Sequence, residues 1–211
     1  MAKDRAGCRN EGEVWASWAK GAFGSAIFCD PAASRVSVPD DPTLQFGGGD
    51  FSIALWICPT QLAIDSKDPR RRFMSKDSPA RSTWWNLNIT TEGRPFLEMR
   101  DSNQAICANR PKGTLPENSW THLAIVVDRA KRKVRYYLNG AADSATDIPE
   151  NFTGSLDVAG GDLSIGGGWQ PFIGLLDEVK IHRRALTDAE VQADYAREKA
   201  NRTSAKYELV E

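Results

Sequence analysis

Aromatic side chains give this chain its clearest means of binding a ligand. Trp84 and Trp85 are adjacent in a segment rich in β-forming residues, so one ring points inward while its neighbour faces outward. Trp169 lies in a Gly-Trp-Gln-Pro sequence, which indicates a loop. An exposed tryptophan presents an apolar face that can stack on a sugar ring. We expect Trp84 or Trp85, together with Trp169, to form a carbohydrate platform. The alternative for each ring is core packing.

Acidic residues near predicted turns supply the oxygen ligands that a hard cation prefers. Asp30 follows a β-forming segment at 26–29, and Asp177 lies in another such segment at 175–182. Ca²⁺ binds carboxylate and carbonyl oxygens, and a carboxylate buried in a strand needs a partner or a metal ion. Asp30 and Asp177 are therefore candidate calcium ligands. In the alternative, such acids accept hydrogen bonds from backbone N–H groups of nearby turns.

Catalytic motifs are scarce in this sequence. It has two histidines, His122 and His182, and neither a Gly-x-Ser-x-Gly elbow nor a phosphate-binding loop. A glycosidase with a sandwich fold needs two carboxylates that face one sugar. Asp177 and Glu178 are adjacent, so they must point to opposite sides of a strand. We expect a non-catalytic protein, with a glycoside hydrolase as a remote alternative.

The composition is that of an ordinary globular domain. The 211 residues are 41% hydrophobic and 26% charged, and the net charge is −1. Such a balance gives no general attraction to nucleic acid or to an anionic membrane surface. No apolar run approaches the roughly 20 residues that a membrane-spanning helix needs, and residues 1–20 contain no apolar signal segment. We therefore expect no nucleic-acid partner, no membrane insertion and no signal peptide in this chain.

Short β-forming segments separated by turn residues dominate the chain, and three glycines at 47–49 are one such break. Many short strands at this spacing are typical of an antiparallel sandwich or jelly roll. Residues 122–138 should form a hairpin around a charged loop. One helix is expected at 187–199, because Thr187 and Glu190 have the spacing of a capping box.

The cysteines leave the disulfide question open. Cys8, Cys29, Cys58 and Cys107 allow three full pairings, and the sequence does not choose among them. None has the Cys-x-x-Cys spacing of a zinc ribbon or a thioredoxin-type site. Cys29 lies in a strand-like segment, where a small buried apolar side chain is the simpler interpretation.

Seven segments in order resemble one known family. Residues 50–57, DFSIALWI, resemble the family's DFTISAWV strand, and residues 174–190 resemble its closing GxIDEVRIYNRALSxxE motif. The other five segments are 23–30, 36–44, 120–124, 134–140 and 163–166. Together they resemble the bacterial-type laminin-G-like (LamG) jelly roll of the concanavalin A-like lectin/glucanase superfamily. We therefore divide the chain into an N-terminal extension at 1–20, a jelly-roll domain at 21–186, and a C-terminal helix and tail at 187–211.

The resemblance implies a two-sheet antiparallel jelly roll used as an extracellular or cell-envelope recognition module. It implies a glycan or another protein as partner and a place in a larger multidomain protein. It also implies a structural calcium ion, and Asp30 and Asp177 correspond to the family's acidic residues near that ion. Pro31 and Ser34 depart from the family's opening motif, and the family's first strand is not evident at 1–13. A missing strand would leave an unpaired edge beside the closing strand. Carbohydrate binding is our first expectation, and a protein–protein adhesion or scaffold role is the alternative.

Overall fold

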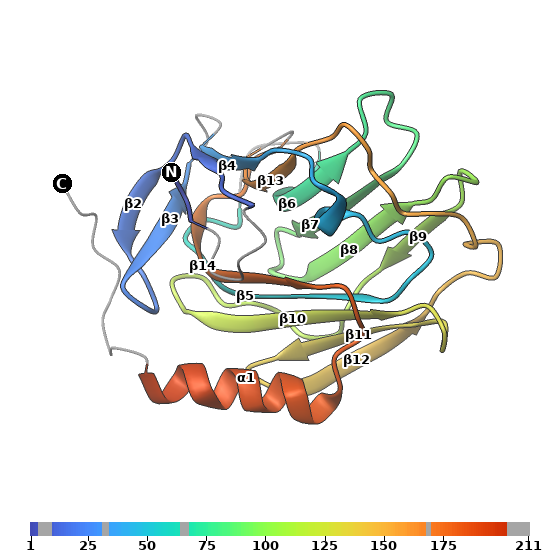
Figure 1. Cartoon of the computed structure of the whole chain (residues 1–211). Helices are drawn as coiled ribbons and strands as arrows, with labels where there is room; N and C mark the ends of the chain where they lie inside the picture. Colours follow the sequence, from blue (N-terminus) through green and yellow to red (C-terminus); the bar gives the residue numbers. More distant parts are fainter. Residues whose placement is uncertain (4–9, 31–33, 64–67, 168–169, 202–211) are drawn as a thin grey trace.

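Two antiparallel β-sheets pack face to face, and one α-helix lies against the outside of one of them (Figure 1). The computed structural model describes residues 1–3, 10–30, 34–63, 68–167 and 170–201. Trp169 and Cys8 lie outside the described residues. The two-sheet antiparallel sandwich predicted from the sequence is confirmed. No helix in the described ranges is both long and apolar enough to cross a membrane.

The first sheet has seven strands. In spatial order they are β1 (Glu13–Val14), β4 (Arg35–Val38), β13 (Leu163–Gly166), β6 (Arg71–Asp77), β7 (Trp84–Ile89), β8 (Pro95–Arg100) and β9 (Ile106–Asn109). Alternate side chains of a strand point to opposite faces of the sheet. Val36 and Val38 of β4, with Leu163 of β13, therefore point into the core between the sheets.

The second sheet also has seven strands. In spatial order they are β12 (Ala141–Asp147), β11 (Lys133–Leu138), β10 (Thr121–Asp128), β5 (Phe51–Pro59), β14 (Gly174–His182), β3 (Ser25–Cys29) and β2 (Ser17–Lys20). Every residue of β5 and β10 is buried. The core covers one face of these strands, and side chains of the helix cover part of the other.

The predicted hairpin at 122–138 is confirmed, because β10 and β11 pair directly from Leu123 opposite Leu138 to Asp128 opposite Lys133. The next turn joins β11 to β12 through Asn139 and Gly140, whose φ angles are +51° and +77°. Two consecutive positive φ angles suit the twist of a tight hairpin, and Asn-Gly tolerates them best.

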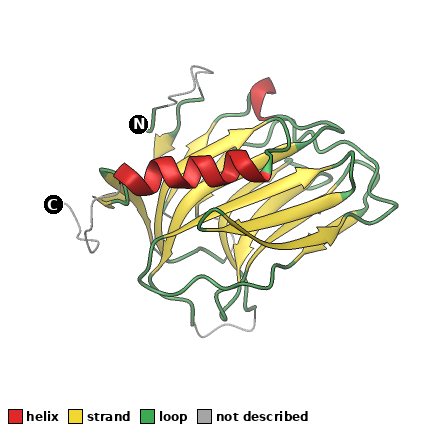
Figure 2. Ribbon diagram, turned by 90° about the horizontal axis from the view of Figure 1, so that it is seen from below, coloured by secondary structure: helices red, strands yellow, loops and turns green. Residues whose placement is uncertain are grey.

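The helix α1 (Asp188–Asn201) begins where the capping box predicts. The Glu190 N–H donates to Thr187 Oγ1 (3.2 Å), and the Thr187 N–H donates to Glu190 Oε2 (2.8 Å). Val191 and Tyr195, four residues apart, both pack towards the second sheet. Figure 2 shows α1 lying over the strands of that sheet.

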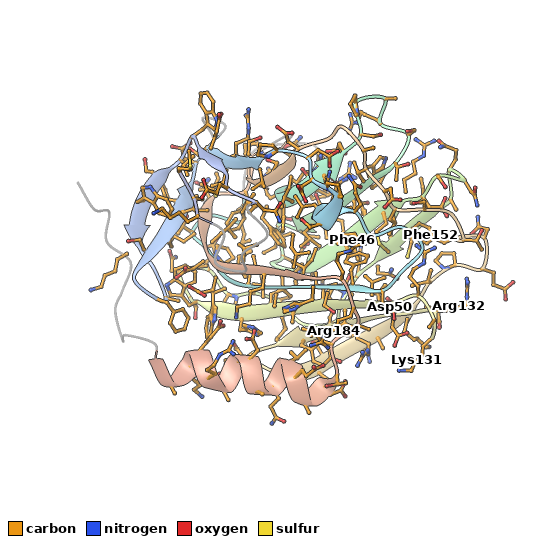
Figure 3. All side chains as sticks on the ribbon, viewed as in Figure 1. Phe46, Asp50, Lys131, Arg132, Phe152 and Arg184 are labelled. Atoms are coloured by element: carbon orange, nitrogen blue, oxygen red, sulfur yellow. The ribbon has the colours of Figure 1, made fainter. Side chains whose placement is uncertain are left out.

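The core fills the space between the two sheets, where Phe46 and Phe152, labelled in Figure 3, lie at one end of the sandwich. Trp56 and Trp120 are buried, and they pack in a second cluster on the outer side of β5. Cys29 and Cys107 are free thiols in the main core. Burial raises the pKa of the Cys29 thiol to about 12.

Residues near the N-terminus belong to the sheets, which corrects the expectation of an extension through residue 20. β1 pairs with β4, and β2 pairs with β3. The closing strand β14 therefore has a neighbour on each side, β5 and β3. The unpaired edge that a missing strand would leave beside β14 does not arise, because β2 takes the edge position.

Candidate functional site

One face of the first sheet is polar, and α1 lies on the other sheet (Figure 1). In β7, Trp85 and Leu87 belong to the hydrophobic core. Because side chains alternate along a strand, Trp84 and Asn86 point away from it. We call the outward-pointing residues of β6, β7 and β8 the open face. They are Arg72, Ser75, Asp77, Trp84, Asn86, Asn88, Phe96, Glu98 and Arg100.

Three neighbouring strands place an acid, an aromatic ring and a base side by side at one end of the open face. Asp77 lies opposite Trp84, and Trp84 lies opposite Arg100. Neighbouring strands are about 4.8 Å apart, so this row spans about 10 Å between its outer Cα atoms. Ile106 of β9 extends the row, and its side chain is 54% exposed. We call Asp77, Trp84 and Arg100 the central row.

The buried guanidinium of Arg72 organises the acidic side of the open face. Its Nη1 donates to Asp77 Oδ2 at 3.1 Å. Its Nη2 donates to the side-chain oxygen of Asn86 at 3.2 Å, with the amide oriented to satisfy its neighbours. Burial lowers the pKa of Arg72, and the Asp77 carboxylate opposes that effect. Arg72 therefore fixes the Asp77 side chain beside Trp84.

Arg70 binds the remaining carboxylates at the opposite end of the open face. Its side chain donates to Asp68 Oδ2 (2.8 Å) and to Glu98 Oε2 (3.3 Å). The hydrogen bond from Arg70 holds the pKa of Asp68 below its usual range. An acid held ionised in this way is a poor general acid at neutral pH.

The central row and the adjacent Arg72 contain polar atoms that have no hydrogen-bond partner among the described residues. Asp77 Oδ1, Arg72 Nε and Arg100 Nε are buried without a hydrogen-bond partner. Within the described part of the chain, the Arg100 side chain makes no hydrogen bond or ion pair. A buried polar group without a partner costs free energy. A ligand rich in hydroxyl groups could both donate to the acid and accept from the base.

The three predicted platform tryptophans have different placements. Trp84 is partly exposed on the open face. Trp85 is only 1% exposed and packs near Phe46, with 5.7 Å between ring centroids. Trp85 therefore presents no surface to a ligand, and its place in the platform is corrected to the core. Trp169 lies outside the described residues.

The two predicted calcium ligands are well separated. Leu176 lies opposite Ile27 in the β14–β3 ladder, so Asp177 and Asp30 are about four residues, or about 13 Å, apart along the strands. Ca²⁺ ligands lie within about 2.6 Å of the ion, so these two carboxylates cannot bind one ion together in this structure. The Ser34 hydroxyl donates to Asp30 at 2.6 Å.

Asp177 is held by the backbone. Its two carboxylate oxygens accept hydrogen bonds from the N–H groups of Phe23 and Glu178, each at 2.9 Å. Burial nevertheless raises the pKa of Asp177 to about 6. This arrangement matches the alternative in which the acid bonds nearby N–H groups.

A cluster that sequence analysis missed lies beneath α1. The side chains of His122, Asp194 and Glu198 offer ligand atoms within 4.8 Å of one another, which is compatible with a metal ion. However, the Lys180 ammonium donates to both carboxylates, including Asp194 Oδ2 at 2.9 Å. The ammonium already supplies the cation that the acids need. The cluster therefore holds α1 on the sheet, with Trp56 Nε1 donating to Glu198 at 2.6 Å.

Sequence analysis also missed Asp77 and Arg100. The sequence contained a signal that Asp77 lies opposite Trp84, because residues 77 and 84 directly flank a short turn at 78–83. Predicting that Arg100 lies opposite Trp84 requires the register of the β7–β8 hairpin, which depends on the turn after Thr90. The sequence alone does not fix either register.

Comparison with known proteins places the chain in a family. The family model described as the concanavalin A-like lectin/glucanases superfamily matches residues 30–192. The chain belongs to this superfamily. The resemblance expected from seven sequence segments is thereby confirmed. No curated protein matches the chain.

Several solved structures have a fold similar to that of this chain. Domain 4 of AbnA, a GH43 extracellular arabinanase from Geobacillus stearothermophilus crystallised with arabinotriose, is 27% identical, with a TM-score of 0.69 and coverage of 92% of both chains. The binding domain of Paraclostridial Mosquitocidal Protein 1 is 21% identical, with a TM-score of 0.75 over 92% of this chain and 48% of that one. The receptor-binding domain of botulinum neurotoxin mosaic serotype C/D is 14% identical, with a TM-score of 0.74 over 92% and 47%. This chain thus spans about half the length of the toxin domains, and the neighbours are binding domains.

Proposed function

We propose that this chain is a non-catalytic carbohydrate-binding module that binds an oligosaccharide on its open face. The central row supports this proposal most directly. A sugar ring lies on Trp84, its hydroxyl groups donate to Asp77, and they accept hydrogen bonds from Arg100. Stacking on an aromatic face combined with flanking donors and acceptors matches the two sides of a sugar, which are apolar C–H surface and polar edge.

The similarity to domain 4 of the arabinanase supports the same function. That domain is 27% identical over 92% of both chains and was crystallised with arabinotriose. We infer that the present chain is likewise an accessory module of a larger extracellular or cell-envelope protein. Its sugar is not assigned by this similarity, because specificity depends on individual side chains rather than on the fold.

The non-catalytic assignment is supported by the carboxylates of the open face. Asp77 pairs with Arg72, while Asp68 and Glu98 share Arg70. A glycosidase needs one carboxylic acid that is protonated at working pH and a second carboxylate across the sugar. Carboxylates that are each bound to a guanidinium do not fit that requirement.

A glycan array probed with the wild-type chain and with Trp84→Ala tests the proposal. Wild type should bind a defined set of oligosaccharides, and the variant should lose about tenfold or more in affinity because the stacking surface is gone. Trp18→Ala is the matched control, since Trp18 is 41% exposed on edge strand β2 of the other sheet. Equal binding by wild type and Trp84→Ala, or no binding by wild type, would contradict the proposal.

Protein recognition is the second candidate function. Trp15 and Trp18 are 62% and 41% exposed where the chain passes from edge strand β1 to edge strand β2. Exposed tryptophans and an open strand edge are features of protein-binding surfaces. This alternative predicts concentration-dependent association that Trp15→Ala weakens, together with an empty glycan array.

A further inference from the structure

The charges of the described residues around Trp84 are not balanced. The open face and its borders include the arginines Arg70, Arg72, Arg81 and Arg100. Three carboxylates belong to the same region: Asp68, Asp77 and Glu98. All three carboxylates form their ion pairs with Arg70 or Arg72. Among the residues that the structure describes, the guanidinium groups of Arg81 and Arg100 are therefore left without an acidic partner.

Arg100 is the more informative of these two arginines. It lies directly opposite Trp84, is partly buried, and has an Nε atom that is buried without a hydrogen-bond partner. Taking a charged group out of water is unfavourable unless an opposite charge or a hydrogen-bond acceptor compensates it. No residue in the described ranges accepts a hydrogen bond from Arg100, and its Nη atoms, which are not among the buried unpaired atoms, are the ones that a ligand could reach.

Arg81 adds to the positive potential at the same end of the open face. It lies in the β6–β7 turn, three residues before Trp84, and its φ angle is +50°. Burial lowers the pKa of Arg72, and the charge of the nearby Arg81 lowers it further. Arg81 is therefore close enough to the central row to repel another cation and to attract an anion.

We propose that the open face prefers an acidic glycan, whose carboxylate or sulfate group binds Arg100 while the sugar ring lies on Trp84. This inference rests on the proposed carbohydrate-binding function and names its ligand class. The planar guanidinium binds either oxyanion through two parallel hydrogen bonds. Asp77, fixed by Arg72 on the other side of the ring, accepts from a hydroxyl group and limits where the acidic group can lie.

The test compares matched oligosaccharides by calorimetric titration. A galacturonate trisaccharide and its methyl ester have the same sugar rings, and esterification removes the charge of the carboxyl groups. A sulfated oligosaccharide with its desulfated form separates sulfate from carboxylate. The wild-type chain should bind at least one acidic form about tenfold more tightly than its neutral counterpart. Added salt should weaken the acidic complex and leave the neutral complex nearly unchanged.

Arginine variants show which side chain binds the acidic group of the glycan. Arg100→Gln should remove most of the acidic preference, because affinity for the acidic form should fall several-fold more than affinity for the neutral form. Arg100→Lys should retain part of the preference because a charge remains. Arg81→Gln, on an exposed turn, should reduce the preference by a smaller factor. Arg183→Gln is the control, because Arg183 is an exposed arginine beyond the end of β14 on the second sheet.

The outcomes separate the two proposals. If wild type binds neutral and acidic forms equally, the acidic preference is wrong and carbohydrate binding stands. If Arg100→Gln keeps both its melting temperature and its full acidic preference, the anion binds elsewhere and the assignment to Arg100 is overturned. If Trp84→Ala and wild type fail alike to bind any of the four sugars and the glycan array is empty, both proposals fail.

Discussion

Arg100 and Trp84 lie directly opposite each other in the β8–β7 ladder, on the side of the sheet that faces away from the core. The neighbouring residue Trp85 points the other way and is buried. One step along the strand thus separates a ring available to a ligand from a ring that stabilises the fold. This alternation makes the two tryptophans separable by experiment.

Replacing each tryptophan by alanine should therefore have different effects. Trp85→Ala should lower the free energy of unfolding by about 3–5 kcal/mol, because it leaves a large cavity in the core. Trp84→Ala should cost about 1 kcal/mol, since its ring is only partly buried. Urea unfolding followed by circular dichroism measures both. Equal losses would mean that Trp84 is a core residue and would remove it from the binding face.

The ion cluster under α1 should contribute to stability. Glu198→Ala removes an acceptor from Lys180 and from Trp56, which is 1% exposed. The expected loss is about 2–3 kcal/mol, because the buried Trp56 indole loses a charged acceptor and Lys180 keeps only one of its two carboxylates. Asp147→Ala is the matched control, since the Lys133–Asp147 pair is solvent-exposed and should contribute less than about 1 kcal/mol. Similar losses for the two variants would contradict the structural role of the cluster.

The stability of the protein should depend on pH through Asp177. Its folded-state pKa, about 6, lies above the ordinary 3.8 because the carboxyl group is buried. A raised pKa means that the protonated form favours folding, so this stability is present below about pH 4 and is lost as pH rises to about 6. Relative to Asp177→Asn, wild type should lose about 2–3 kcal/mol between about pH 4 and about pH 7.

Urea unfolding in the presence of a chelator measures this difference. A relative stability of wild type that rises with pH would instead mean that the ionised carboxylate has a favourable partner within the folded protein.

Calcium binding stays a prediction of the sequence, and thermal unfolding tests it. An ion that binds only the folded chain at a concentration 100 times its dissociation constant adds about 2.7 kcal/mol to the free energy of unfolding. Calcium should then raise the melting temperature, and EDTA should reverse the rise. Asp30→Asn and Asp177→Asn made separately show which carboxylate takes part, since the two are too far apart to share an ion. A melt indifferent to both calcium and EDTA would remove the prediction.

The sequence predicted the fold well, for physical reasons that particular elements illustrate. The α1 capping box and the β10–β11 hairpin depend on local chemistry, and both appear as expected. The strand β2 was missed, because Ser17–Lys20 has only four residues and becomes a strand only by pairing with β3. Pairing with a distant segment leaves little mark on a single short stretch of sequence.

The candidate site was predicted only in part. Trp84 was identified by its residue type, but the sequence could not separate it from Trp85, because the direction of each ring depends on which face of the strand meets the core. Asp77 and Arg100 become neighbours of Trp84 through the registers of two hairpins. His122, Lys180 and Glu198 come together only when α1 folds back onto the second sheet.

The indole N–H signals of the seven tryptophans offer the most direct test of the central claim. In a two-dimensional ¹H–¹⁵N spectrum, Trp84→Phe identifies the Trp84 signal by its disappearance. Titration with the strongest oligosaccharide ligand from the array should shift the Trp84 signal progressively and leave the Trp18 signal in place. A saturating ligand that shifts Trp15 or Trp18 but not Trp84 would contradict binding on the open face.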